Sequence, residues 1–348
     1  IVFDCGKYKD AYKKLVTAPD DNLVIDLFNQ SLVVKALEEK ADAVLVLALA
    51  PVTAFTVQIL KNAGIKTLHY FCEDLRAEEH WRPIIGVYDF FFVIQKDPWL
   101  KELRGLNPNT FYCPNGAPLE HMNDGTLPRE HDTVFVGAPY QNRILFLEKL
   151  SAMGVDFRIW GWGWDQYPLS AELKKKVVNG TRWLAFDEIV TLYSRARIVL
   201  NLHSTLTGAE VETEGDFVNP RLFTVPMCRA LQITDRRKAV FDFFEEDKEV
   251  VCFSSLPELA KKIDYFLHNP DHAQRIIDAA YKKTQGAHLL STRLSEMLAI
   301  VFPERTQVTL DGQIAGVKSR QRGGQQLTDD DMLFLLADNI RTQCSSEE

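Results

Sequence analysis

The chain has 348 residues, enough for two domains of ordinary size, and its 46% hydrophobic and 25% charged residues are globular proportions. The net charge of −8 argues against nucleic acid as a partner, because binding a phosphate backbone requires clustered Lys and Arg. A small anionic molecule is not excluded, since it needs only a local positive pocket.

In the first third of the chain, short apolar runs that favour strands alternate with amphipathic segments that favour helices. Helical patterns cover residues 31–40 and 53–63, and Gly64 is placed to cap the second of them. Near-continuous apolar strands between helices are typical of a parallel sheet covered on both faces. The strands predicted here are residues 1–4, 23–28, 43–49, 65–70, 90–94 and 110–113.

The pattern stops at residues 120–132, which are polar and predict a linker. It then restarts, so the chain predicts two Rossmann-like domains, with ligands outside the carboxyl ends of the strands and in the cleft between the domains. The second series predicts strands at 133–137, 157–161, 198–203, 231–234 and 249–253, and helices at 142–153, 187–196, 257–268 and 270–285.

The remaining sequence features concern the tail of the chain and the cellular compartment of the protein. Residues 303–326 are polar, and residues 329–341 predict one more amphipathic helix. The six cysteines stand singly without CxxC spacing, which indicates a reduced, cytoplasmic protein. The first residues show no signal-peptide pattern, and the longest apolar run, residues 43–55, is too short to span a bilayer.

The strongest local signal for a binding site is VFVGAPYQNR at residues 134–143. A strand that ends at Gly137, a loop with Tyr140 and then a helix N-terminus would point backbone N–H groups at an anion. Arg143, in the first helical turn, could hold a diphosphate through two parallel hydrogen bonds. The alternative is an ordinary strand–turn–helix with a surface arginine.

Residues 157–164, FRIWGWGW, combine glycines and tryptophans at the end of a predicted strand. Gly161 and Gly163 would let the backbone approach a ligand closely, and Trp162 and its neighbours would offer flat faces to a base or a sugar. The stretch is incomplete as a dinucleotide fingerprint, because no helix follows it at once. A tryptophan-rich loop packed against the core is the alternative.

Polar residues also mark the end of the strand predicted at 198–203. Asn201 and His203 alternate with leucines, so they share one face at the cleft edge of the sheet. Asn219 and Arg221 follow the acidic run 210–216. The alternatives are a structural histidine and an arginine that neutralises the acidic loop.

In the first half, Glu73 and Asp74 follow the strand predicted at 65–70, where a general base or a partner for a sugar hydroxyl would lie. Surface loops commonly hold such acids as well. The sequence contains no Ser-His-Asp order, HExxH, Walker A motif or DxD-type metal pair, so it gives no support to a metal-dependent mechanism.

The order of these motifs is more specific than any one of them. A Gly-x-x-Tyr-x-x-Arg loop is followed by IWGWGW, by YSRARIVLNLH ending at His203, by Asn-x-Arg-x-Phe at residues 219–223 and by Thr-Asp at residues 234–235. This succession resembles the CgeB-like, spore-maturation-type glycosyltransferases of the GT-B fold. The resemblance is good over residues 132–297 and looser over residues 40–120.

The resemblance implies an α/β protein of GT-B architecture, with two Rossmann-like domains facing across a cleft. It places an acceptor-side domain at residues 1–128, a nucleotide-sugar-binding domain at 129–302 and a tail at 303–348. The implied activity is metal-independent transfer of a hexosyl group from a nucleotide-diphosphate sugar, most simply a UDP-sugar, to an unidentified acceptor. It implies no cofactor, and neither nucleic acid nor a membrane span.

The same resemblance distributes roles among the candidate residues. Diphosphate stabilisation would fall to helix N-termini, backbone amides and arginines. The catalytic candidates are Glu73, Asp74 and His203, and the donor-binding candidates are Gly137, Tyr140, Arg143, Gly161, Trp162, Gly163, Asn201, Asn219, Arg221 and Thr224.

Two positions depart from the family pattern. Thr224 stands where family members carry a glutamate for the ribose hydroxyls, and Arg229 stands where a small residue is expected. Another acid could substitute, and Glu210, Glu212 and Glu214 are near in sequence. The alternative function is therefore a non-catalytic GT-B relative that binds a sugar, a nucleotide or a protein. A sugar-nucleotide epimerase fits the motif order less well.

Overall fold

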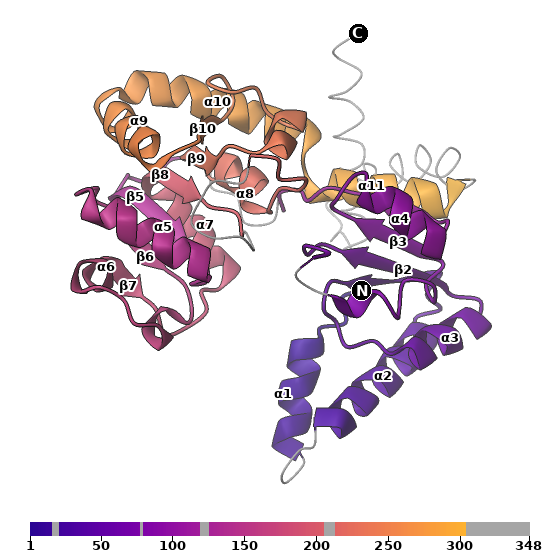
Figure 1. The fold of residues 1–348 in the computed structure, drawn as a ribbon. Coiled ribbons are helices and arrows are strands. Elements are labelled where there is room, and N and C mark those ends of the chain that lie inside the picture. Colours follow the sequence, from indigo (N-terminus) through magenta and orange to yellow (C-terminus); the bar gives the residue numbers. More distant parts are fainter. Residues whose placement is uncertain (16–20, 77–78, 119–124, 205–212, 304–348) are drawn as a thin grey trace, which may run out of the picture. The chain divides into compact units, whose positions relative to one another are not determined.

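The computed structural model describes residues 1–15, 21–76, 79–118, 125–204 and 213–303. The chain divides into two compact units, Ile1–Pro114 and Asn115–Glu348, each built on one parallel sheet (Figure 1). This division falls before the boundary expected at residue 128. The predicted α/β class with two parallel sheets is confirmed.

The first unit contains a four-stranded sheet in the order β1-β2-β3-β4, with every neighbouring pair parallel. Phe28 and Leu32 of one helix pack with Phe71, Phe91 and other strand residues in its core. The strands are β1 (Ala43–Leu47), β2 (Lys66–Phe71), β3 (Phe90–Val93) and β4 (Thr110–Tyr112), and the helices are α1 (Cys5–Leu15), α2 (Asp21–Glu38), α3 (Ala54–Asn62), the 3₁₀ turn η1 (Glu79–Trp81) and α4 (Trp99–Leu106).

Two strands predicted near the start of this unit are wrong. Residues 1–4 form no strand, and residues 23–28 lie inside α2. The buried residues of α2 include Val24, Phe28, Leu32 and Ala36, which recur every fourth residue and form one helical face. A window of six residues, five of them apolar, is too short to show that period, so the prediction of a buried strand was wrong.

The second unit contains a six-stranded sheet in the order β10-β9-β8-β5-β6-β7, again wholly parallel. Its strands are β5 (His131–Val136), β6 (Arg158–Trp160), β7 (Val177–Asn179), β8 (Ala196–Asn201), β9 (Leu231–Asp235) and β10 (Val251–Phe253). Its helices are α5 (Gln141–Ala152), η2 (Trp164–Gln166), α6 (Ala171–Lys176), α7 (Phe186–Ser194), α8 (Arg221–Met227), η3 (Lys238–Asp242), α9 (Leu256–His268), α10 (Pro270–Ala287) and α11 (Leu290–Val301).

Helices cover both faces of this second sheet (Figure 1). Phe135 of β5 faces a core shared with α5, α9 and α10, whereas its neighbours Val134 and Val136 face a smaller core shared with α7 and α8. Successive strand residues point to opposite faces, so each strand must be apolar on both sides. This explains the near-continuous apolar runs of the sequence.

The five strands and four helices predicted in the second series are all present, with ends shifted by a few residues. Between β6 and α7, the 3₁₀ turn η2, the helix α6 and the strand β7, each of three to six residues, were not expected. The helix predicted at 329–341 and part of the predicted linker lie outside the described residues.

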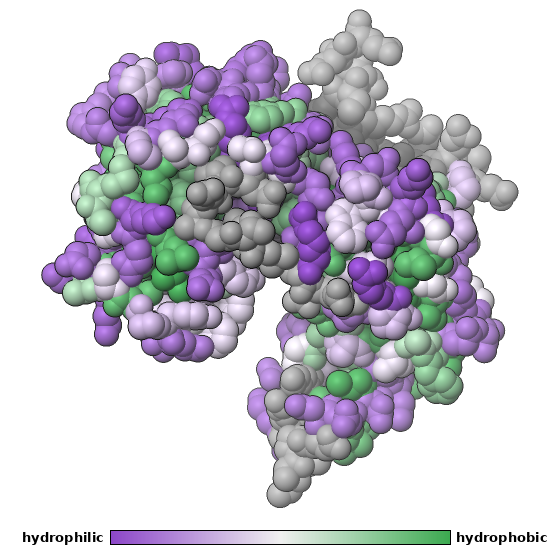
Figure 2. Space-filling view, in the orientation of Figure 1, coloured by the Kyte–Doolittle hydropathy of each residue, from purple (hydrophilic) through white to green (hydrophobic). Residues whose placement is uncertain are grey.

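The face shown in Figure 2 is largely hydrophilic, with hydrophobic residues in scattered patches. Among the residues that the structure describes, no helix combines the length and the apolar character needed to cross a membrane.

The loops that follow β5 and β6 touch through their backbones. Gly161 follows β6 with a φ of 144°, and a Cβ atom at this position would fall well inside contact distance of the Gly137 carbonyl oxygen. The Gly137 carbonyl also accepts a hydrogen bond of 2.8 Å from Nε1 of the buried Trp164. Glycine at 161 therefore permits the approach of the two loops.

We expect Gly161→Ala to lower the free energy of unfolding by several kcal/mol, because a methyl group would force the β5 and β6 loops apart. Gly154→Ala is the matched control, since Gly154 also has a positive φ, of 80°, but open space where a Cβ atom would lie. That control should cost only about 1–2 kcal/mol of backbone strain. Chemical denaturation measures both, and equal losses would contradict the close approach.

Candidate functional site

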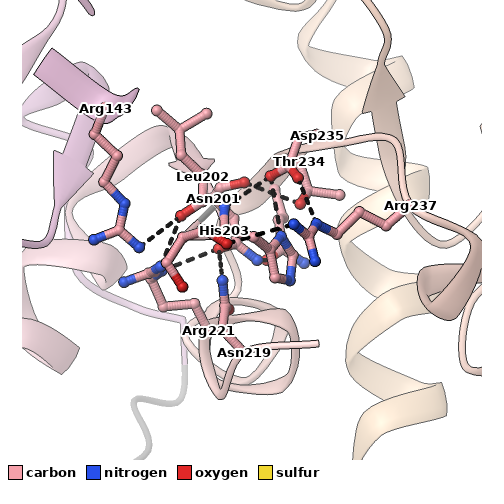
Figure 3. A network of polar contacts seen from close by, with 11 residues as sticks. Arg143, Asn201, Leu202, His203, Asn219, Arg221, Thr234, Asp235 and Arg237 are labelled. Atoms are coloured by element: carbon pink, nitrogen blue, oxygen red, sulfur yellow. Dashed lines mark hydrogen bonds and ion pairs between the residues drawn. The ribbon is translucent and has the colours of Figure 1, made fainter. Parts of the chain in front are cut away.

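Buried polar side chains gather at the carboxyl ends of β8 and β9 (Figure 3). Asn201 ends β8, His203 follows it, and Asp235 ends β9. The chain returns to this place through Asn219 and Arg221. Arg221 begins helix α8.

Asn201 lies at the centre of the network and has no exposed surface. Its Nδ2 donates to Gln232 Oε1 at 2.9 Å, and its Oδ1 accepts from Asn219 Nδ2 at 2.8 Å and from Arg221 Nε at 3.0 Å. The Thr234 hydroxyl donates to the Asn201 carbonyl. One amide thus ties β8 to β9 and to the start of α8.

Two guanidinium groups meet beside this amide. Arg143 donates to the carbonyl oxygens of Ala138, at 3.2 Å, and of Leu202, at 2.9 Å. Arg221 also donates to the Leu202 carbonyl at 2.9 Å, and more weakly to Val136 at 3.4 Å. The carbonyl of Leu202 therefore serves both arginines, and it holds the end of β8 against the loop after β5.

Arg143 is only 5% exposed, so it is not the surface arginine of the alternative interpretation. Burial lowers its pKa to about 9, with the charge of Arg221 acting in the same direction, so it stays protonated at neutral pH. Burial likewise lowers the pKa of Arg221. Among the residues that the structure describes, neither guanidinium is bonded to a carboxylate.

The nearby carboxylate of Asp235 is taken up by other partners. Its Oδ1 accepts from the backbone N–H of His203 at 2.9 Å and lies 3.0 Å from His203 Nδ1, and its Oδ2 accepts from Arg237 Nε at 2.9 Å. Burial alone would raise the pKa of Asp235, but His203 and Arg237 hold it well below its usual range. The cluster thus sets three guanidinium groups, of Arg143, Arg221 and Arg237, against one carboxylate.

Burial lowers the pKa of His203 to about 4, although the Asp235 carboxylate opposes the shift. The imidazole is therefore neutral at pH 7. Its Nε2 is buried and, within the described part of the chain, has no hydrogen-bond partner.

Helix α5 begins at Gln141, next to this positive cluster. Its N-cap residue, Tyr140, has φ −59° and ψ 145° and makes no side-chain hydrogen bond to the first turn. The Tyr140 ring instead lies over the Arg143 guanidinium, 4.7 Å from it. An N-terminus without a side-chain cap, beside two guanidinium groups, is suited to an anion.

The alternative of a tryptophan-rich loop packed against the core holds for Trp164 but not for Trp162. Trp164 is buried, but Trp162 is 42% exposed and stacks on Trp183, which is 72% exposed, with centroids 5.9 Å apart and an interplanar angle of 11°. Gly163, between Trp162 and Trp164, has a φ of 94°. The stacked pair presents an exposed aromatic face after β6 and β7.

Of the two positions that depart from the family pattern, one lies inside α8 and the other just before β9. Thr224 is buried in α8, and its hydroxyl donates to the Pro220 carbonyl at 3.1 Å. Arg229 precedes the amino end of β9, has a φ of 54°, and lies over Tyr281 at 3.7 Å with Asp278 nearby. Arg229 is thus remote from the carboxyl-end cluster.

Three acids were considered as substitutes for the missing glutamate, and the structure describes one of them. Glu214 is exposed. Glu210 and Glu212 lie outside the described residues.

Glu73 and Asp74 lie in the first unit, after β2. Asp74 accepts hydrogen bonds from the guanidinium of Arg76, at 2.9 and 3.3 Å, and from Gln95 at 3.2 Å. Glu73 is exposed. Asp74 is therefore an engaged carboxylate, held by a cation and an amide.

Four residues of this region were not selected from the sequence. Asp235 is the polar residue that ends a buried strand. Ligands bind at the carboxyl ends of such strands, and this argument, which selected His203, applies equally to Asp235. Gln232 and Arg237 lie close to Asp235 in the sequence, and Trp183 follows β7, a strand that was not predicted. No sequence pattern indicated these three residues. In the described part of the chain, no group of three or more His, Cys, Asp or Glu side chains is placed to hold a metal ion.

Comparison with known proteins defines the class. Residues 143–299 match the family model described as "Glycosyl transferase-like". The fold is similar to the crystal structure of a glycosyltransferase from Rickettsia africae ESF-5, with a TM-score of 0.54 and 15% identity over 84% of each chain. It is also similar to Anabaena Alr3699/HepE in complex with UDP-glucose, with a TM-score of 0.56 and 12% identity over 79% of this chain and 81% of that one.

A curated relative points to the subgroup. The chain is 23% identical over 250 residues to the spore protein CgeB of Bacillus subtilis (strain 168), covering 69% of this chain and 77% of CgeB. The resemblance predicted from the sequence is therefore confirmed: the chain is similar to CgeB and, over residues 143–299, to glycosyl transferase-like proteins, and it has the fold of GT-B structures.

We expect Asn201→Leu to lower the free energy of unfolding by about 3 kcal/mol or more, because it leaves buried Gln232 and half-buried Asn219 and Arg221 without this partner. Thr234→Val removes a single hydrogen bond at the neighbouring strand end and should cost about 1 kcal/mol. Urea denaturation followed by tryptophan fluorescence gives both values. Similar losses would show that the amide is not the centre of the network.

Proposed function

We propose that the protein is a glycosyltransferase that takes its sugar from a nucleotide-diphosphate donor bound at the carboxyl edge of the second sheet. The observation that carries the proposal is a pair of guanidinium groups, those of buried Arg143 and half-buried Arg221, that lack a carboxylate partner in the described structure. A buried charge without a counter-ion is costly, and an anionic diphosphate would compensate it.

The same groups suit the chemistry of transfer. When the bond between the sugar and the diphosphate of the donor breaks, negative charge develops on the departing diphosphate. Arg143, Arg221 and the first-turn amides of α5 are already fixed by the fold, so little reorganisation is needed to stabilise that charge. Arg143 acts here through its charge, because its terminal nitrogens are bonded to carbonyls. The mechanism needs no metal ion.

The base of the nucleotide has a candidate surface in the stacked Trp162 and Trp183. Their exposed faces follow β6, which pairs with β5, and β7, which pairs with β6. The loop after β5 leads into α5. Aromatic faces bind bases by stacking. UDP is the first nucleotide to test, because the similar Alr3699/HepE structure contains UDP-glucose.

Binding without transfer is the second candidate function, and Thr224 favours it. A buried hydroxyl that already donates to Pro220 offers a ribose far less than a carboxylate would. Arg229 gives this alternative no support, because it precedes the amino end of β9, whereas the polar cluster lies at the carboxyl end. Glu73 and Asp74 stay candidates for contacts with the acceptor, which is unidentified.

Incubation with a panel of UDP-, GDP- and TDP-sugars, with release of free nucleotide as the readout, separates these functions. Turnover with one donor supports the transferase. Binding of a nucleotide in calorimetry without release from any donor favours the binding module. Absence of binding for every nucleotide would remove the transferase and leave only a module that binds a sugar or a protein.

We expect Arg221→Met to weaken UDP binding by about 1.5–3 kcal/mol, roughly 10- to 100-fold, because it removes a charged partner of the diphosphate. Arg221→Lys, which keeps the charge, should lose less. Uridine is the control ligand, since it lacks phosphate and its affinity should not change in either variant. Isothermal titration measures the affinity of each variant for UDP and for uridine, relative to the wild type. An equal loss of affinity for uridine would mean that the variant only disturbs the fold.

A further inference from the structure

His203 holds one ring nitrogen in a fixed contact and leaves the other without a partner in the described chain. The Asp235 carboxylate can only accept hydrogen bonds, so the 3.0 Å contact between its Oδ1 and Nδ1 requires the proton on Nδ1. Nε2 of the neutral ring then carries a lone pair. Its surroundings are buried, and an unpaired polar atom in such a place costs free energy.

Asp235 is itself held from two further sides. The backbone N–H of His203 donates to the same Oδ1 at 2.9 Å, and Arg237 Nε donates to Oδ2 at 2.9 Å. These contacts fix the carboxylate, and the carboxylate fixes the orientation of the imidazole. The low pKa of His203, about 4, agrees with a ring that stays neutral.

The ring also lies next to the groups assigned to the diphosphate. Residue 202, directly before His203, supplies the carbonyl that binds both Arg143 and Arg221. In a nucleotide-sugar the transferred sugar is joined directly to the diphosphate. His203 follows this carbonyl at the same strand end, which is the end that a sugar joined to the diphosphate would approach.

We propose that Asp235 is a positioning residue that fixes the tautomer of His203, so that Nε2 accepts a hydrogen bond from a hydroxyl group of the transferred sugar. This assignment rests on the proposed function. A lone pair on Nε2 repels phosphate oxygens, which cannot donate, whereas sugar hydroxyls can donate to it. His203 is thus a specificity residue that reads the sugar, rather than the acid or base of the reaction.

Long-range ¹H–¹⁵N spectra of the histidine rings test the tautomer without any ligand. Among the eight histidines of the chain, His203 is assigned by the signal lost in His203→Gln. We expect a protonated Nδ1 and an unprotonated Nε2 in the wild type, and loss of that single tautomer in Asp235→Asn, whose amide can also donate. A proton on Nε2 in the wild type would overturn the proposal.

The sugar contact is tested by adding UDP and then UDP-glucose, UDP-galactose or UDP-N-acetylglucosamine. The Nε2 signal should move with at least one UDP-sugar and not with UDP. His203→Phe should weaken the binding of that UDP-sugar about tenfold, the worth of one hydrogen bond, and change UDP affinity less than about twofold. A shift already complete with UDP, or equal losses for UDP and every sugar, would overturn the proposal.

The two proposals fail in different ways. If UDP does not bind the wild type at all, the proposed function and the sugar contact both fall, while the tautomer is still measured. If UDP binds but no UDP-sugar moves the Nε2 signal, only the role of His203 falls. His203→Gln, whose side-chain oxygen can still accept, should retain more of the sugar preference than His203→Phe if both variants fold.

Discussion

The structure of the second unit depends on how buried guanidinium charge is accommodated at one sheet edge. Arg143 and Arg221 satisfy their donors with carbonyl oxygens at the ends of parallel strands, above all that of Leu202. Carbonyls complete the hydrogen bonds but leave the charge without a counter-ion, and the Asp235 carboxylate is committed to His203 and Arg237. The fold therefore maintains a positive site that an anion can compensate.

This constraint links the fold to the proposed chemistry. The close approach of Gly161 to Gly137 sets the loop that precedes α5, and Asn201 sets the start of α8. Each guanidinium is thereby fixed before a ligand arrives, which is the condition for efficient stabilisation of a departing anion. Neutral His203, held by Asp235, adds a group of different character beside them.

The sequence predicted the second unit well and the first less well, for a physical reason. Strands such as β5 and β8 are short, apolar on both faces and bounded by helices, which leaves few alternatives. Residues 23–28 were misassigned because the i, i+4 face of α2 becomes visible only when followed to Ala36. In the site, strand ends identified Asn201 and His203, but the partners Gln232 and Arg237 depend on strand order and register, which local sequence does not encode.

The central claim is that an anionic diphosphate occupies the edge of the second sheet at α5. A crystal structure of the protein soaked with UDP tests it most directly. The account predicts phosphate oxygens at the first-turn amides of α5, beside Arg143 and Arg221, with the base toward Trp162 and Trp183. Density for UDP at any other place, with those amides bonded only to solvent, would contradict it.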